Sequence, residues 1–545
     1  MSETEQSPSV TASHWRWHLL AAAILLGVAA LRVWYLASAC TLDLAPDEAH
    51  YWDWSRHPDW SYYSKGPAVA YLIRGATFLA ELFGAASVLN PVLVVRLPAV
   101  LCGSLLLLSL YVLALQVYGR PRLALGVMGL ALIMPLVSVG AIVMTIDAPY
   151  CCCWGWALVF GYRAIFHNSN WAWAATGLTV GAGMLAKQTM VLWLPGAGMF
   201  LMCSPDHRNK LWRPGFWLMV ALAGLCSLPM VIWNAQHDWV TFRHVGGQAG
   251  VTESAGIRWL GPFQFLGAQF GLLLGFWFVA WLVGMIRRNP WREGDAPSQY
   301  LWWMSATVFG VFLAFSLKAE EQPNWPVTAY LSGLVLGTET LLRQLQALRP
   351  AARRWALAGA GLCCSVSLTT TIVLHRTEWV RPQLALLAGS PRREGELPLR
   401  RLDPTCRLRG WQVLAARVDE LRQQLREQGA EPVLAGTAWN LPGELGFYCS
   451  GHPTVFSLGP PLGDRHSQYD FWRPNPVLDA DEFAGCTMIL VGPPTPQLNE
   501  AFQSIERVPD VTFCVDGEPV ARWNVTICRG YRGFAAVGGG SRPAY

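Results

Sequence analysis

Apolar stretches recur along roughly the first 375 residues of the chain, separated by short polar connections. Each is close to the ~20 residues that a helix needs to cross the hydrocarbon core of a bilayer. The stretches lie at 17–38, 92–116, 122–141, 149–165, 171–186, 188–203, 214–233, 264–286, 299–317, 326–342 and 355–375. Two of them nearly meet at Lys187, which leaves the exact count open. The pattern predicts an α-helical polytopic membrane protein with about eleven transmembrane helices, give or take one or two.

Lysine and arginine are concentrated in every second connection between these stretches. If the N-terminus is cytoplasmic, the short connections on that side hold Arg120, Arg122, Arg163, Arg208, Lys210, Arg213, Arg287, Arg288, Arg292, Arg343, Arg349, Arg353 and Arg354. The opposite connections, 39–91, 234–263 and 318–325, are longer and richer in aromatic residues. Because basic residues favour cytoplasmic loops, we expect these longer connections, and the chain after about residue 376, outside the cytoplasm. The N-terminus is polar up to Ser13 and has no short cleavable apolar core, so we expect the first stretch to stay as a span.

The segment after residue 375 has a different pattern. It is polar and rich in arginine, and an amphipathic helix is expected near 410–428, with Leu414, Val418, Leu421 and Leu425 on one face. Short runs at 432–435, 487–491 and 511–515 have β character. The sequence therefore predicts a transmembrane domain over 1–375, with a long outer loop near 39–91, and a small extracytoplasmic α/β domain over 376–545.

Cysteine usage depends on the predicted compartment. Five cysteines lie in the C-terminal segment: Cys406, Cys449, Cys486, Cys514 and Cys528. Because extracytoplasmic compartments are oxidising, one or two disulfides are expected among them. Their number is odd, and the sequence leaves the pairing open.

Composition supports the membrane interpretation. Hydrophobic residues make up 53% of the 545-residue chain and charged residues only 14%, against about 25% charged residues in a typical soluble domain. The mean hydropathy is +0.28. The 28 tryptophans also suit a chain that crosses the bilayer–water interface repeatedly. The net charge of +5 is small and lies mostly in short loops, so we expect membrane lipids as partners and no nucleic acid.

The densest group of charged residues lies in the first outer connection. It reads Asp43-Leu-Ala-Pro-Asp47-Glu48-Ala-His50-Tyr51-Trp-Asp53-Trp-Ser-Arg56 and continues to Tyr62-Tyr63-Ser-Lys65-Gly66-Pro67. Asp47 and Glu48 after a proline can simply cap a helix and complement its dipole. That interpretation leaves Asp53, Arg56 and Lys65 unexplained among so many aromatic rings. An aromatic-lined cleft with a carboxylate base and a cationic phosphate clamp explains all of them.

Further polar residues lie at the same edge of the membrane. Asp147 in Met144-Thr-Ile-Asp147-Ala-Pro149 begins a span, Lys187 separates two apolar runs, and Arg32 lies near the outer end of the first span. Singly, these residues fit a helix cap or side chains that snorkel to the interface. The segment Lys318-Ala-Glu320-Glu321-Gln-Pro323-Asn324-Trp325-Pro326 also fits a polar hairpin. Charge inside a span is costly, about 2.5–3.5 kcal/mol per residue, so their grouping on one side indicates a functional site.

These motifs resemble those of a known family. Pro46-Asp47-Glu48-Ala-His-Tyr-Trp, Tyr62-Tyr63-Ser-Lys65-Gly66-Pro67, Thr145-Ile-Asp147-Ala-Pro149, Leu185-Ala-Lys187 and Gln322-Pro-Asn324-Trp325-Pro326 occur in an order and topology similar to the bacterial C-type glycosyltransferases. These enzymes are related to protein O-mannosyltransferases and to lipid A aminoarabinose transferases. In the tail, Glu444-Leu-Gly-Phe447-Tyr448 and Ser467-Gln468-Tyr469-Asp470-Phe-Trp472 resemble the soluble domain of one bacterial branch. The chain departs from many relatives at Ser64, where they carry an acidic residue or histidine, and in having Gly66 between Lys65 and Pro67.

The resemblance implies an enzyme of the bacterial inner membrane that transfers a sugar from a polyprenyl-phosphate donor. It implies an outer-face active site, inversion at the anomeric carbon, a lipid or glycan acceptor such as lipopolysaccharide, and neither a cofactor nor a metal. Asp47, Glu48 and Asp147 are the expected catalytic residues. The expected substrate-binding residues are Lys65, Lys187, Arg32, Arg243, His50, Tyr51, Tyr62, Tyr63, Glu321, Asn324 and Trp325.

Other functions remain open on the sequence alone. A lipid-sugar transporter or flippase also places charges inside a helix bundle, although transporters usually show internal repeats and charges at the bilayer midplane. A membrane-anchored assembly protein is a second alternative, but it leaves the Asp47 group without a role. Transfer of the sugar to a protein is a third. Turnover of a polyprenyl-phosphate sugar separates the transferases from the first two.

Overall fold

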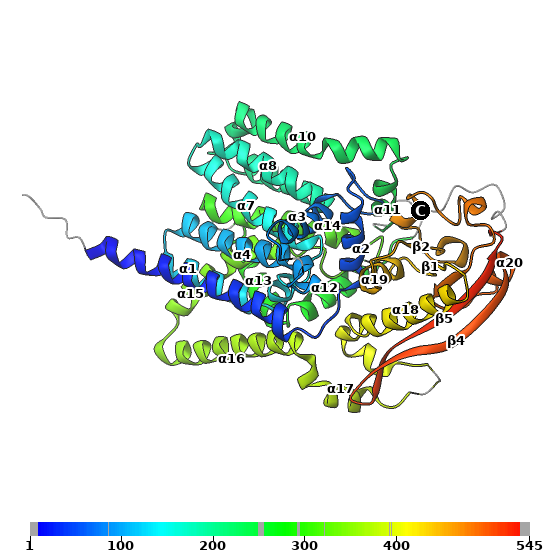
Figure 1. The fold of residues 1–545 in the computed structure, drawn as a ribbon. Helices are drawn as coiled ribbons and strands as arrows, with labels where there is room; N and C mark the ends of the chain where they lie inside the picture. The colour runs from blue at the N-terminus through cyan, green and yellow to red at the C-terminus, as the bar shows by residue number, and fades with distance from the viewer. Residues whose placement is uncertain are drawn as a thin grey trace, which may run out of the picture. The chain divides into compact units, whose positions relative to one another are not determined.

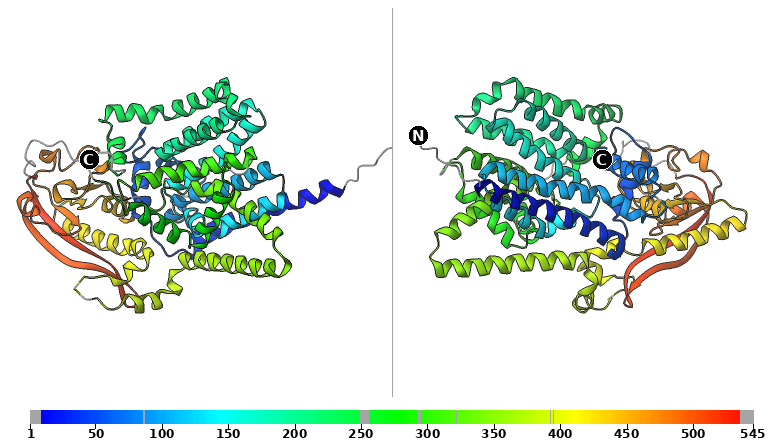
Figure 2. Two further views of the ribbon diagram at one scale, coloured as in Figure 1. Left: turned by 180° about the vertical axis from the view of Figure 1, so that it is seen from behind. Right: turned by 60° about the vertical axis from the view of Figure 1, so that its left-hand side comes forward.

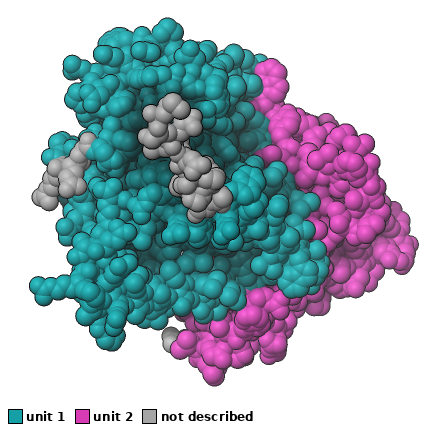
Figure 3. All heavy atoms as spheres, turned by 90° about the vertical axis from the view of Figure 1, so that its left-hand side faces the viewer, with its two compact units in different colours: residues 1–38, 65–69, 96–375 teal, residues 39–64, 70–95, 376–545 magenta. Residues whose placement is uncertain are grey.

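The structure is a computed structural model, and it describes residues 9–85, 87–248, 256–291, 295–320, 322–391, 393 and 395–534. The chain divides into two compact units (Figure 3). Unit 1 consists of residues 1–38, 65–69 and 96–375. Unit 2 consists of residues 39–64, 70–95 and 376–545. The first outer connection therefore lies mostly in the same unit as the C-terminal segment.

Unit 1 is built from helices (Figure 1). The helices are α1 (Ser9–Trp34), α4 (Pro91–Tyr118), α5 (Pro121–Ile133), α6 (Pro135–Gly140), α7 (Asp147–Phe166), α8 (Asn170–Ala186), α9 (Trp193–Cys203), α10 (Pro214–Gln236), α11 (Val240–Gln248), α12 (Gly261–Leu272), α13 (Phe276–Arg287), α14 (Ala296–Phe315), α15 (Ala329–Ala347) and α16 (Pro350–His375), with 3₁₀ turns at Gln188–Leu192 and Arg208–Trp212. Helix α4 begins in unit 2, and a π-helical turn at Tyr35–Ala39 ends there. Most of the predicted apolar stretches coincide with one of these helices.

Several of these helices are long and apolar enough to cross a membrane. Among the described residues there are 4 such segments: Trp15–Ala39, Pro91–Tyr118, Pro214–Gln236 and Pro350–His375. The number rises to 5 if the bent pair α12–α13 is counted as one span. The predicted class, a helical membrane protein with several apolar helices, is confirmed. The larger count of about eleven spans stays a prediction.

The stretch at 264–286, which was expected to be one span, is broken into two helices. Helices α12 and α13 meet at an angle of 115°. The backbone reverses at Leu274 and Gly275, which have φ angles of 54° and 66°. A glycine adopts this left-handed conformation without steric cost. The stretch at 122–141 is also interrupted, because Pro135 begins α6 and has no amide hydrogen with which to continue α5.

Helices α7, α8 and α10 lie side by side in unit 1 (Figure 1). Gly177 and Gly181 on α8 allow α10 to approach closely. A β-carbon on Gly177 would lie 2.5 Å from the carbonyl oxygen of Met219, and one on Gly181 would lie 2.4 Å from the β-carbon of Cys226. Small residues four positions apart are a common means of close helix packing within membranes.

Unit 2 contains a five-stranded mixed sheet in the order β2-β1-β3-β5-β4. The strands are β1 (Val433–Gly436), β2 (Val455–Ser457), β3 (Met488–Val491), β4 (Phe502–Val515) and β5 (Glu518–Tyr531). Strand β1 pairs in parallel with β2 and β3, whereas β5 pairs antiparallel with β3 and β4. Figure 2 shows the long β4–β5 hairpin. The helices of this unit are α2 (Pro46–Arg56), α3 (Ala68–Leu82), α17 (Arg381–Ala388), α18 (Trp411–Glu427), α19 (Leu441–Tyr448) and α20 (Leu498–Ala501).

The expected helix near 410–428 is confirmed as α18, and its four predicted apolar residues are buried. The three expected strands correspond to β1, β3 and part of β4. Strands β2 and β5 and helix α19 were not predicted. Strand β2 has only three residues, and β5 contains charged residues that obscure its alternating pattern.

The expected disulfides are absent, which corrects that prediction. All five cysteines of the C-terminal segment are free thiols. Cys406, Cys449 and Cys528 are buried in three separate hydrophobic clusters of unit 2. Burial raises the pKa of Cys449 and of Cys528 to about 12, so these thiols behave as small apolar core residues.

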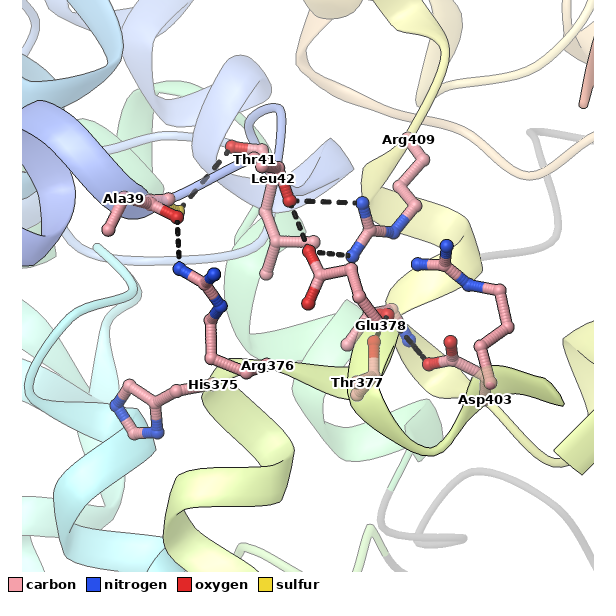
Figure 4. A network of polar contacts seen from close by, with 12 residues as sticks. Ala39, Thr41, Leu42, His375, Arg376, Thr377, Glu378, Asp403 and Arg409 are labelled. Atoms are coloured by element: carbon pink, nitrogen blue, oxygen red, sulfur yellow. Dashed lines mark hydrogen bonds and ion pairs between the residues drawn. The ribbon is translucent and has the colours of Figure 1, made fainter. Parts of the chain in front are cut away.

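Polar contacts in unit 2 hold the start of the first outer connection against the segment that follows α16 (Figure 4). The guanidinium of Arg376 donates to the carbonyl of Ala39 at 3.1 Å. Glu378 accepts from the Thr41 hydroxyl and from Arg409, the latter at 3.0 Å. Farther along, Asp43 accepts from the Trp411 backbone at 3.0 Å. These contacts fix the chain immediately before α2.

Candidate functional site

Asp147 is the centre of a polar group inside unit 1. One carboxylate oxygen lies 2.7 Å from the Lys187 ammonium, and the other accepts a 2.7 Å hydrogen bond from the side-chain amide of Asn324. The ammonium also lies 5.3 Å from the centroid of the Tyr150 ring. Three residues predicted from distant parts of the sequence are therefore in direct contact.

These side chains come from helix ends or from a turn between helices. Asp147 begins α7, Lys187 follows the last residue of α8 in an extended conformation, and Asn324 lies in the turn before α15. Tyr150, one turn after Asp147, bonds through its hydroxyl to Thr328 at 3.0 Å. Tyr150 and Thr328 were not predicted, although the i+3 spacing from Asp147 places Tyr150 on the same helix face.

An apolar cavity of about 500 Å³ adjoins this polar group. Asp147 and Asn324 line it together with aliphatic side chains from α4, α6, α12, α15 and α16. Cavities of this size commonly hold a small molecule or part of a lipid. The arrangement therefore combines a largely hydrocarbon surface with a carboxylate, an amide and a cation at its edge.

Arg32 lies beside the same cavity. Its side chain is only 6% exposed. A β-carbon on Gly103, a residue of the cavity wall, would lie 3.4 Å from one terminal guanidinium nitrogen. Among the described residues, neither terminal nitrogen of Arg32 has a hydrogen-bond partner. A buried guanidinium without a partner is costly, and it suits an anionic group of a ligand.

The turn that carries Lys65 packs close to Lys187. A β-carbon on Gly66 would lie 2.1 Å from the carbonyl oxygen of Leu185, two residues before Lys187. Only glycine fits at this position. Gly66, between Lys65 and Pro67, thus allows a tight contact between this turn and the end of α8.

In unit 2, helix α2 carries Asp47 and Glu48 in its first turn. Asp47 is exposed, whereas Glu48 is buried. A carboxylate oxygen of Glu48 accepts a 2.8 Å hydrogen bond from the backbone amide of Ala45. The sequence allowed a helix-capping role for Asp47 and Glu48, and this contact shows that role for Glu48. Asp47 is the carboxylate that remains accessible for chemistry.

The aromatic residues around α2 form a packed cluster in unit 2. The His50 ring lies 4.8 Å from that of Trp54, 5.6 Å from Trp439 and 5.0 Å from Tyr469. Burial, with a smaller effect of Arg465, lowers the pKa of His50 to about 3. His50 is therefore neutral at physiological pH.

The predicted tyrosines also belong to this cluster. Tyr51 packs edge-on against Trp54, and Tyr62 stacks on Trp54 while its hydroxyl donates to backbone carbonyls. The Tyr63 backbone amide donates to Gln468 at 2.6 Å. The contacts of Tyr51 and Tyr62 support α2, whereas Tyr63 contacts Gln468 and Phe471.

The remaining expected residues have different surroundings. Arg243 is half-buried on α11, and Trp325 packs against Phe312. Glu321 lies outside the described residues. Asp53, buried on α2, forms an ion pair with Arg56 at 3.2 Å, and burial raises its pKa.

Within the described part of the chain, no three His, Cys, Asp or Glu side chains are grouped as metal ligands.

The fold resembles that of a solved membrane protein. The structure of ArnT from Cupriavidus metallidurans in the apo state superimposes with a TM-score of 0.57 at 17% identity, covering 94% of this chain and 98% of that one. The same protein bound to undecaprenyl phosphate gives a TM-score of 0.59 at 17% identity, covering 93% and 98%. The chain therefore has the same helical fold as these two structures, together with a small C-terminal sheet.

Sequence comparison narrows the relationship. Residues 64–233 match the family described as dolichyl-phosphate-mannose-protein mannosyltransferase. The lipid A galacturonosyltransferase RgtD of Rhizobium johnstonii is 30% identical over 313 residues, which make up 57% of this chain. The aligned region spans 63% of the length of that curated relative. The resemblance to bacterial C-type glycosyltransferases that the motifs indicated is confirmed.

Proposed function

We propose that this protein is an inverting glycosyltransferase that moves a sugar from a polyprenyl-phosphate donor to a lipid A-type glycolipid of the cell envelope. The observation that carries the proposal is the Asp147–Lys187–Asn324 group at the edge of an apolar cavity. A polyprenyl-phosphate sugar has the matching chemistry, because it joins a hydrocarbon chain to a phosphate and a hydroxyl-rich ring. The relative RgtD, named for transfer to lipid A, supports the acceptor class.

In this proposal the donor phosphate binds Lys65 and Lys187, and Arg32 and Arg243 add positive charge. The close packing of the Lys65 turn against the end of α8 supports a joint role for the two lysines. The isoprenoid chain occupies the apolar cavity. The sugar is contacted by Glu321, Asn324 and Trp325. The loop that carries α2 is held by His50, Tyr51, Tyr62 and Tyr63.

The chemistry is a displacement at the anomeric carbon. An oxygen of the acceptor attacks this carbon from the face opposite the phosphate, a new carbon–oxygen bond forms, and the polyprenyl phosphate leaves with the bonding electrons. Asp47 takes the proton from an acceptor hydroxyl, a contribution of about 10²–10⁴-fold. If the acceptor oxygen belongs to an ionised phosphate, Asp47 orients it instead. Glu48 positions Asp47 through the helix cap, and Asp147 holds Lys187 and Asn324 in place.

The leaving group is a stabilised phosphate, so the proposed reaction needs no cofactor and no metal ion. We place the reaction at the extracytoplasmic face of the bacterial inner membrane, with about eleven spans in total. The C-terminal segment is extracytoplasmic in this topology. The basic inner connections and the longer, aromatic-rich outer connections between the predicted spans support this orientation.

The test is a comparison of envelope glycolipids by mass spectrometry. A deletion strain is complemented with the wild-type gene or with Asp47→Asn, and membrane insertion of both proteins is matched by immunoblotting. The wild type should restore one sugar-sized mass increment on a glycolipid, and Asp47→Asn should not. Equal restoration by both would remove Asp47 from the catalytic role. No glycolipid change with the wild type would contradict the proposed acceptor.

A further inference from the structure

A second cavity, of about 660 Å³, lies within unit 2. Helix α2 contributes Trp52, Ser55 and Arg56 to it, and α3 contributes Arg74 and Phe78. Further wall residues are Val94 and Val95 at the start of α4 and Phe447 on α19. The walls thus combine two guanidinium groups with aliphatic and aromatic side chains.

The two arginines differ in their partners. Arg56 is held by Asp53 at 3.2 Å, by the His452 carbonyl at 2.9 Å and over the Trp52 ring. Arg74 is exposed and donates to the Ser55 carbonyl at 3.1 Å. The ion pairs found among the described residues do not include Arg74.

The other ionisable residues of the wall are Tyr71, Glu81 and His452, and Glu81 is the carboxylate among them. Glu81 lies two turns after Arg74 on α3, about 10 Å along the helix axis. Asp53, which does not line the cavity, is paired with Arg56. The end of the cavity at Arg74 therefore carries positive charge. An anion is the complementary ligand for this end.

Helix α3 also presents apolar side chains to the surroundings. Its exposed residues include Tyr71, Phe78, Leu79 and Leu82, and Phe83 follows directly. In a membrane protein, such a face suits a helix that lies in the plane of the bilayer interface. The ligand of the adjoining cavity then comes from the lipid leaflet, with its polar end at Arg74 and a hydrocarbon chain along Phe78, Val94 and Val95.

We infer that this cavity binds a phosphate-bearing membrane lipid, with the phosphate held by Arg74 and Arg56. The occupant is a phospholipid of the surrounding leaflet and not the acceptor. Trp52 and Arg56 follow Asp47 by five and nine residues on α2, which places them about 140° and 180° around the helix axis from it. The cavity is therefore on the far side of α2 from the proposed base, and the inference does not depend on the proposed function.

The bound phosphate would join two elements of unit 2. Arg74 already connects α3 to the Ser55 carbonyl on α2, and Arg56 lies on the last turn of α2. A phosphate that binds both guanidinium groups would hold α3 against α2. The lipid thus acts as a structural ligand that keeps α2 in position.

The experiment is photolabelling of the full-length protein in maltoside micelles, which contain no phosphate. Two probes carry the same diazirine on an acyl chain, one a phosphatidic acid and the other the matching diacylglycerol. Labelled peptides are mapped by mass spectrometry. The phosphatidic acid should label residues 71–95 at least about tenfold more than the diacylglycerol, because the charge-assisted contact needs the phosphate. Equal labelling by both probes would overturn the inference.

Variants identify the cation. Arg74→Gln should lower phosphatidic acid labelling to the diacylglycerol level, and Arg74→Lys should keep most of it. Arg417→Gln is the matched control, since Arg417 is paired with Glu420 on α18 and does not line the cavity. Unchanged labelling of Arg74→Gln would remove Arg74 from the site. Excess lipid A should compete no better than unlabelled phosphatidic acid at equal phosphate, and stronger competition would identify the acceptor as the occupant and refute the assignment.

Discussion

The ion pair between Asp147 and Lys187 offers the sharpest test, because its structural and chemical roles can be separated. Replacing Lys187 with methionine keeps the apolar stem and removes the charge. Asp147 then keeps only the Asn324 amide as a described partner. Asp147→Asn removes the other charge, and the double variant removes both.

The structural cost follows from the burial of the pair. Breaking a fully buried ion pair costs about 3–5 kcal/mol, whereas an exposed pair contributes up to about 1 kcal/mol. The Lys187 side chain is 8% exposed and that of Asp147 24%. We therefore expect Lys187→Met to lower the free energy of unfolding by about 2 kcal/mol. The double variant leaves no unpaired charge and should recover most of this loss.

Activity should behave differently. If Lys187 also binds the donor phosphate, its loss removes a charge-assisted contact of about 1.5–3 kcal/mol. That corresponds to roughly a 10–150-fold fall in kcat/KM. The double variant should not recover it, because neither substitution restores a cation.

The assay measures thermal unfolding and sugar transfer on the same four purified proteins. Recovery of stability without recovery of transfer supports the phosphate role. Recovery of both in the double variant would refute it, because Lys187 would then serve only to neutralise Asp147. No loss of either in Lys187→Met would contradict the contact geometry itself.

Three further predictions concern other parts of the chain. Asp47→Asn should reduce transfer by about 10²–10⁴-fold and leave the melting temperature unchanged, since Asp47 is exposed; a large melting shift would indicate a structural role. Gly66→Ala should destabilise the protein by about 1–3 kcal/mol because of the Leu185 carbonyl, whereas Gly126→Ala, with open space around its β-carbon, should not. The pKa of His50 is about 3 in the folded protein, against 6.5 when the side chain is exposed. Below pH 6.5 the unfolded state therefore binds a proton that the folded state does not, and the free energy of unfolding falls by at most about 1.4 kcal/mol per pH unit. His50→Gln should flatten this part of a pH–stability curve.

Much of the fold could be predicted because long apolar stretches have few alternative structures. The amphipathic repeat at 410–428 is equally direct, since four residues at helical spacing define one face. The bend at Leu274–Gly275 was missed because both halves are apolar, and hydropathy alone does not report backbone direction. Strand β2 was missed because its pairing partner is set by tertiary contacts.

The polar site was partly predictable for a different reason. Charged residues in apolar surroundings are costly, so Asp147 and Lys187 were each predicted as candidate site residues. The resemblance then grouped them with Asn324. Their direct contact depends on how α7, α8 and the turn before α15 meet, which no local pattern contains. Glu48 shows the converse: the sequence allowed both a cap and a catalytic role, and only the Ala45 contact shows the cap.

The glycine contacts between α8 and α10 have a consequence for how precisely the site is built. Gly181 lies six residues before Lys187, about 9 Å along the helix axis. Because it has no side chain, the backbone of α8 contacts α10 directly at this point. The two helices therefore keep a fixed register, and any added volume at Gly177 or Gly181 must push α8 as a whole. A displacement near 1 Å at the far end is enough to impair a reaction that depends on alignment. Loss of activity can thus originate at a neutral, buried helix contact that never touches the substrate.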